Sequence, residues 1–284
     1  AWELKRGSQL DAAGASVRNH PDGRIWAEHI VEVRKSGPRS GQIVWQWHAW
    51  DHLVQNTDSG APDYASPVRL PRRMDVNYNP GRTPDWLHAD AMDYNPALDQ
   101  IALCLRNTGE VWIIDHSTST EQAASSSGGL MHRGGDILFR WGNSAAYGAA
   151  GRITLQKPRD ARWVAHGRPG QETLLIANGT NQATGQATLI EIQPQYYFKG
   201  TTLSARTIWS YEGSSGAPIP GGSLSGAGRL PGGNTQVCDG PGGRVFEVTP
   251  GGETVREQSA PATPLYRARR IPSDHPGLAR LAMP

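Results

Sequence analysis

Ile30-Val31-Glu32-Val33 is the first of four copies of one short pattern, in which two apolar residues are followed by an acidic one. The other copies are Ile113-Ile114-Asp115-His116, Leu189-Ile190-Glu191-Ile192 and Val245-Phe246-Glu247-Val248. A second stretch that predicts a strand follows each copy: Val44–Trp47, Leu138–Trp141, Ile208–Tyr211 and the degenerate Val255–Gln258. The recurrence predicts a repeated all-β unit.

A repeated β unit of this size cannot cover both of its own faces, so neighbouring copies must stack. Radial stacking of four-stranded blades is the common solution, and it predicts a β-propeller with loops of every blade around a central channel. The 284 residues include 34 Gly and 21 Pro, which fit short strands joined by turns in a single domain over residues 1–284.

The first residues, Ala1–Leu4, resemble a strand from the middle of a blade, with no inner strand before them. We therefore expect the N-terminal part of the propeller to be absent from this chain. A missing N-terminal segment or another chain is the expected partner at that end.

The composition bounds the class of protein. A net charge of +2 predicts no general nucleic-acid surface, so that any anion site must be local. No apolar run reaches the length of a membrane span, and no signal peptide is recognisable. Cys104 and Cys238 occupy similar positions in different repeats, too far apart to bridge, and are expected to be buried thiols.

Inner strands are predicted to start at Asp85–His88, Arg159–Trp163 and Ser225, and Leu265–Ile271 is predicted to add a last inner strand. Two insertions interrupt the repeats. We expect the first insertion (Trp47–Asp85) at the channel mouth and the second insertion (Ser117–Gly135) on the opposite face, because they follow different strands of a blade. Long loops in a compact fold are commonly functional or mobile.

His88 is the strongest candidate for chemistry. It stands at the start of an inner strand, and Arg106 ends the strand after it, so that antiparallel pairing would bring the two residues together at the mouth. A histidine beside an arginine suits an anionic group, since arginine offers a planar fork of donors. The alternative is a histidine held by backbone carbonyls and an Arg106 paired with Asp90.

His48, Asp51 and His52 begin the first insertion and form a second candidate. They could bind a metal, bind substrate or orient one another for proton transfer. A third ligand at a diagnostic spacing is lacking, so we predict no metal site. The competing hypothesis is a loop anchored by Trp47 and Trp50, in which the polar side chains form hydrogen bonds with backbone groups of the loop.

Four stretches resemble the arylsulfotransferase family, and the resemblance covers most of the chain, from about Trp26 to about Gly277. They are Trp47-His48-Ala49-Trp50-Asp51-His52-Leu53-Val54-Gln55, Asp85-Trp86-Leu87-His88, Asp93-Tyr94-Asn95-Pro96 and Val111-Trp112-Ile113-Ile114-Asp115-His116-Ser117-Thr118. The resemblance implies a six-bladed β-propeller of periplasmic or extracellular location. It also implies sulfuryl transfer from an aryl sulfate to a phenol through a histidine at the channel mouth, with no cofactor.

Residue by residue, the resemblance makes His88 a sulfate-binding histidine and Arg106 the anion-binding arginine. The family's next inner strand usually starts His-Asp-Ala, and its histidine is the expected nucleophile. Here the triplet is Arg159-Asp160-Ala161, and arginine stays protonated and cannot attack sulfur.

Two hypotheses follow from this departure. The chain is a sulfotransferase whose nucleophile is another histidine, His88 or His48, with Arg106 and Arg159 holding sulfate. Alternatively, it has lost catalysis and serves as an anion-binding, structural or interaction module. A quinone-dependent dehydrogenase propeller is a weaker third possibility, since no regularly repeated tryptophan motif of that kind is present.

Overall fold

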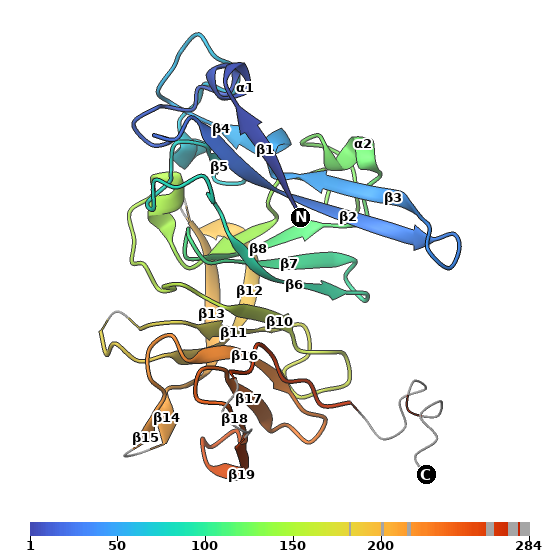
Figure 1. Cartoon of the computed structure of the whole chain (residues 1–284), viewed down its shortest axis with the longest axis vertical. Helices are drawn as coiled ribbons and strands as arrows, with labels where there is room; N and C mark the ends of the chain where they lie inside the picture. Colours follow the sequence, from blue (N-terminus) through green and yellow to red (C-terminus); the bar gives the residue numbers. More distant parts are fainter. Residues whose placement is uncertain (182, 200–201, 215–216, 260–263, 272–277, 279–284) are drawn as a thin grey trace.

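A computed structural model describes residues 1–181, 183–199, 202–214, 217–259, 264–271 and 278. Antiparallel strands form four consecutive blade sheets, which lie one after another in chain order (Figure 1). The first sheet has three strands, β1 (Trp2–Arg6), β2 (Arg24–Lys35) and β3 (Gly41–His48). The second has β6 (Ala89–Asn95), β7 (Gln100–Leu105), β8 (Glu110–Asp115) and β9 (Phe139–Trp141).

The third sheet consists of β10 (Asp160–Trp163), β11 (Leu174–Asn178), β12 (Thr188–Lys199) and β13 (Thr202–Tyr211). The fourth consists of β16 (Leu224–Arg229), β17 (Thr235–Asp239), β18 (Arg244–Val248) and β19 (Thr254–Ser259). Short elements decorate the sheets: α1 (Ser8–Ala12), α2 (Thr120–Ala123), and the two-residue strands β4 (Leu53–Val54), β5 (Met74–Asp75), β14 (Gly213–Ser214) and β15 (Ala217–Pro218).

The repeated pattern that decides the fold lies where the sequence predicts it. The four copies fall in or at the end of β2, β8, β12 and β18, the strand next to the outer strand of each sheet. The second stretches fall largely in the outer strands β3, β9, β13 and β19. Each outer strand pairs antiparallel with the strand that carries the copy before it. The repeat is therefore a structural unit.

Three hydrophobic clusters lie between consecutive sheets and hold the stack together. Trp47 and Leu103 belong to the cluster between the first and second sheets. Ile113 and Ile176 belong to the next, and Leu189 and Phe246 to the one between the third and fourth sheets. Burial of both faces of the middle sheets follows from the apolar strands β7, β8 and β11, in which every residue is buried.

The inner strands of successive sheets lie side by side. The Trp163 backbone N–H donates to the Asp93 carboxylate at 2.9 Å, which ties β10 to β6. On the other side of β10, a Cβ at Gly226 of β16 would meet the Asp160 carboxylate at 2.6 Å, so a larger residue there would force this side chain to shift. Four-stranded antiparallel sheets stacked about their inner strands make this an all-β protein of the β-propeller class.

The predicted placement of the two insertions on opposite faces is wrong. The insertions are in contact: Trp47 Nε1 donates to the Gly135 carbonyl at 2.8 Å, and Arg73 donates to the Ser126 hydroxyl at 2.9 Å. The reason is that the first insertion runs along the outer edge of the second sheet, where Ile137 N–H donates to the Arg72 carbonyl.

The segment Leu265–Ile271 is not the predicted strand. It is irregular and attaches to the fourth sheet through Leu265 N–H and the Gly240 carbonyl, 2.9 Å apart. Its arginines reach different blades, since Arg267 pairs with Asp160 at 3.4 Å and Arg270 pairs with Glu247 at 3.3 Å. Side-chain ion pairs thus fix this segment instead of a strand ladder.

Both cysteines are buried free thiols, as predicted. Within the described part of the chain, no helix has the length and apolar character needed to cross a bilayer.

Candidate functional site

His88 precedes the inner strand β6 in a backbone conformation that few non-glycine residues adopt, with φ of 52°. Two backbone hydrogen bonds fix it there: Arg106 N–H donates to the His88 carbonyl at 3.0 Å and Asn107 N–H to the Leu87 carbonyl at 3.1 Å. The ends of β6 and β7 therefore meet as the sequence predicts. Left-handed conformations at residues of this kind are concentrated at functional sites.

A carboxylate contacts each nitrogen of the His88 ring. Asp85 pairs with Nδ1, and Asp90 Oδ1 lies 3.2 Å from Nε2. Asp90 is the extra residue of a β-bulge, because Ala89 pairs with Leu105 and Ala91 already pairs with Cys104. A bulge re-aims a side chain, and here it turns the Asp90 carboxylate toward the start of the strand. Carboxylates only accept hydrogen bonds, so each nitrogen of the His88 ring faces an acceptor.

Arg159 joins this group from the neighbouring blade. It immediately precedes β10, and its Nη1 lies 3.2 Å from Asp90 Oδ2. Asp90 therefore bridges His88 and Arg159, and the pairing of Asp90 with Arg106 expected in the alternative is not formed. The half-buried Arg106 side chain makes no ion pair with any carboxylate among the described residues.

A cavity of about 230 Å³ borders the group, and Asp90, Glu28, His29 and Arg267 are among its lining residues. Glu28 accepts a hydrogen bond from the Ala89 N–H at 2.9 Å, while its Oε2 is buried without a partner among the described residues. Burial raises the pKa of Glu28 to about 7; the Ala89 N–H opposes this and the charge of Asp85 adds to it. Such a shifted carboxyl in a cavity is typical of a functional site.

Replacing Glu28 with Gln should make the stability less dependent on pH. The Glu28 pKa is 4.5 before folding and about 7 after it, so the folded protein holds the proton more tightly, and stability falls as pH rises through this window. Above pH 7 the ionised carboxylate costs roughly 3 kcal/mol. Urea unfolding should show Glu28→Gln to be more stable than the parent chain at pH 8 and similar to it at pH 4. An equal difference at both pH values would contradict this.

The structure does not bring His48 and His52 to His88. His52 is completely buried; its Nδ1 lies 2.9 Å from Asp136 and its Nε2 2.8 Å from the Ala123 carbonyl. Both nitrogens are engaged and the ring stacks on Trp47, so His52 fastens the two insertions together instead of contacting a substrate. His48 ends β3 and faces Glu3 and His29 on the first sheet.

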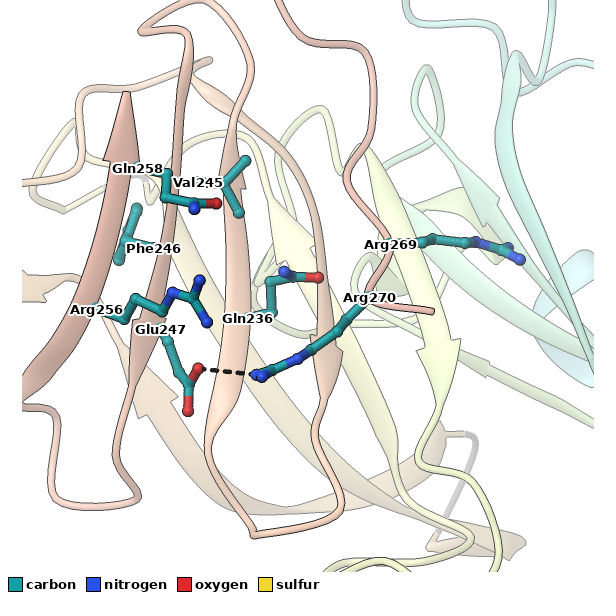
Figure 2. A pocket seen from close by; sticks show the side chains of 8 residues that line it. All are labelled: Gln236, Val245, Phe246, Glu247, Arg256, Gln258, Arg269 and Arg270. Atoms are coloured by element: carbon teal, nitrogen blue, oxygen red, sulfur yellow. Dashed lines mark hydrogen bonds and ion pairs between the residues drawn. The ribbon is translucent and has the colours of Figure 1, made fainter. Parts of the chain in front are cut away.

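A larger cleft of about 880 Å³ lies between the third and fourth sheets and the segment 268–271. It was not apparent from the sequence, because its arginines come from separate repeats: Arg162, Arg168, Arg229, Arg269 and Arg270. An adjoining pocket of about 220 Å³ shares Arg269 and Arg270, which point in opposite directions (Figure 2). Several of these charges are already matched, since Arg270 pairs with Glu247 and Arg229 pairs with Glu191.

The acidic half of the His88 group was missed by sequence reasoning. Asp85 and Asp90 flank His88 by three and two residues, which is a visible signal, but the bulge that turns Asp90 toward Nε2 is not. Glu28 comes from another repeat, and its position depends on how the first sheet packs against β6.

No family model matches this chain, and no curated protein matches it. Similar solved structures include a Bacteroides caccae protein of unknown function, with 14% identity and a TM-score of 0.37 over 63% of this chain and 48% of that one. Kuenenia stuttgartiensis hydrazine synthase has 10% identity and a TM-score of 0.35, over 63% of this chain and 37% of that one. The β-propeller domain of Cps50 (Swd1) from Myceliophteria thermophila has 10% identity and a TM-score of 0.37, over 84% and 57%. The match spans about half of the Bacteroides caccae protein and about a third of hydrazine synthase. Similarity at these TM-scores carries no argument about function.

Proposed function

We propose that the chain binds an aryl sulfate beside His88 and transfers its sulfuryl group to a phenol. One observation carries the proposal: the half-exposed His88 ring is held by Asp85 and Asp90, and Asp90 is in turn held by Arg159 of the next blade. A histidine oriented through Nδ1 by a carboxylate is the arrangement that activates Nε2 in nucleophilic and general-base catalysis.

The chemistry would proceed in two steps. The Nε2 proton passes to Asp90, and the Nε2 lone pair attacks sulfur while the bond from sulfur to the aryl oxygen breaks; the leaving phenolate takes the proton from Asp90. In the second step the acceptor phenol gives its proton to Asp90, its oxygen attacks sulfur, and the N–S bond breaks. Asp90 then returns the proton to Nε2, which closes the cycle.

Guanidinium groups would stabilise the charge on the sulfuryl oxygens in both steps. Arg106 and Arg159 are the arginines expected in this role, and Arg267, which lines the adjoining cavity, is a third. The six-bladed ring, the arylsulfotransferase family and a periplasmic or extracellular location belong to the same proposal. They rest on the sequence resemblance.

A second candidate, an anion-binding module without turnover, is favoured by one feature of the site. Asp90 Oδ1 already occupies the position beside Nε2 that the sulfur atom must approach, so transfer requires Asp90 to move aside. In the binding module Asp90 would stay in place, and the arginines alone would hold the anion.

Binding and turnover measured on the same protein separate the two candidates. With an aryl sulfate as donor and a phenol as acceptor, transfer predicts release of the donor phenol in step with sulfation of the acceptor. Binding of the aryl sulfate without release would favour the module. Arg159→Gln should weaken binding about tenfold or more, since charge-assisted hydrogen bonds are lost, whereas the exposed Arg206→Gln on β13 serves as a matched control. Equal binding by both variants would exclude the site in either form.

A further inference from the structure

Three side chains from the three strands of the first sheet converge on one face of that sheet. Glu3 lies on β1, His29 on β2 and His48 at the end of β3. The register explains the convergence: His29 is directly opposite His48, and Glu3 is opposite Ala27, which is two residues from His29 and so points to the same face. We call these residues the Glu3 cluster.

The ligand atoms of the Glu3 cluster face one another. Glu3 Oε1 lies 3.0 Å from His48 Nδ1 and 3.8 Å from His29 Nδ1. The two imidazole rings stack with their centroids 3.9 Å apart and 18° between their planes, which brings both Nδ1 atoms to the same oxygen. One ligand atom from each residue lies within 4.8 Å of the other two.

We propose that the Glu3 cluster is a binding site for one divalent transition-metal ion of the zinc type. Two imidazoles and a carboxylate are a ligand set that zinc accepts, with a fourth position left open. Tetrahedral zinc ligands lie about 3.3 Å apart. The contact of 3.0 Å between Glu3 and His48 is already that close, and His29 at 3.8 Å from Glu3 has to approach by about half an ångström. A turn of one ring out of the stack would aim its lone pair at the ion.

The surroundings of the cluster support an ion at this place. Lys5 Nζ lies 2.9 Å from Glu3 Oε2, which fixes the carboxylate and leaves Oε1 for the ion. All three side chains are largely withdrawn from solvent, with exposures of 29%, 17% and 21% for Glu3, His29 and His48. His29 also lines the cavity that Glu28 and Asp90 border, so the open position of the ion would be within reach of that cavity.

Among the described residues no other histidine belongs to such a group of ligands, and His116 supplies a matched control. His116 also contacts two carboxylates, but Asp99 lies 2.6 Å from Nδ1 and Glu32 lies 3.3 Å from Nε2. Because the carboxylates sit at opposite nitrogens of the ring, one ion cannot bind His116 and both of them.

The proposal is tested by titrating Zn²⁺ into the full chain, which is prepared without a histidine tag. Calorimetry should give one ion per chain and a raised thermal midpoint, because an ion that binds only the folded state stabilises it. Glu3→Gln and His48→Gln should each weaken binding about tenfold or more, whereas His116→Gln should leave it unchanged.

Co²⁺ in place of Zn²⁺ provides a second readout, since a tetrahedral nitrogen and oxygen site gives intense visible absorption that Glu3→Gln should abolish. Circular dichroism establishes that each variant is folded. The proposal is overturned if the parent chain binds no Zn²⁺, or if both cluster variants bind as tightly as His116→Gln does.

Discussion

Arg140→Met is expected to lower the free energy of unfolding by about 3–5 kcal/mol, the cost of leaving a buried partner charge alone. Arg140 Nε and Nη2 donate to the two oxygens of Glu110 at 2.8 and 2.6 Å, and the side chains are 2% and 0% exposed. The same guanidinium donates to the Pro71 and Arg73 carbonyls, so the pair also holds the first insertion against the outer edge of the second sheet. The total free energy of unfolding of a typical domain is only about 5–15 kcal/mol, so this loss is a large share of it.

Two control variants separate a buried charge from general damage. Asp63→Asn breaks the exposed ion pair between Asp63 and Arg73 and should cost about 1 kcal/mol or less. Glu110→Leu combined with Arg140→Met removes both charges and should recover much of the loss. Chemical unfolding monitored by fluorescence measures all three. A double variant no more stable than Arg140→Met would show that packing, not the unpaired carboxylate, sets the cost.

His88→Ala is expected to reduce sulfuryl transfer by about a thousandfold or more, the scale of loss when a covalent nucleophile is removed. The fold should be retained, because the ring is half exposed and the backbone bonds of the turn do not depend on it. Arg106, Arg159 and Arg267 remain, so the aryl sulfate should still bind. The measurement is the initial rate of phenol release at saturating donor, with binding followed separately.

Added imidazole provides the control for this variant. It can occupy the space left by the ring and should restore part of the rate to His88→Ala, while His132→Ala, in the second insertion, should behave as the parent chain. A His88→Ala variant with an unchanged rate would remove His88 from the reaction. Full loss of binding together with the rate would indicate that the ring holds the anion instead of attacking it.

The repeated strands could be predicted from the sequence because their determinants are local. The motif Leu189–Ile192 and the apolar run Gln100–Leu105 both lie in strands, and β7 has the predicted bounds, whereas β12 continues past the motif to Lys199. The backbone hydrogen bond between Arg106 and His88 followed from the same logic, since antiparallel pairing of two adjacent strands leaves little choice of register.

The features that could not be predicted depend on packing between repeats or on a change of register within a strand. The bulge at Asp90 changes which residues the Asp90 carboxylate contacts, and no residue type in the sequence indicates that a bulge forms there. Leu265–Ile271 was predicted to be a strand, but it is irregular and its arginines pair with carboxylates on two blades. The convergence of Glu3 with His29 and His48 likewise needs three strands in register.

The most direct test of the account is a search for the covalent intermediate. The full chain is mixed with an aryl sulfate in the absence of acceptor, quenched without acid, digested and analysed by mass spectrometry. The account predicts one added sulfuryl group on the peptide that contains His88, lost when a phenol acceptor is supplied and absent from His88→Ala. Phenol release with the group on another residue, or acceptor sulfation with no labelled histidine, would contradict it.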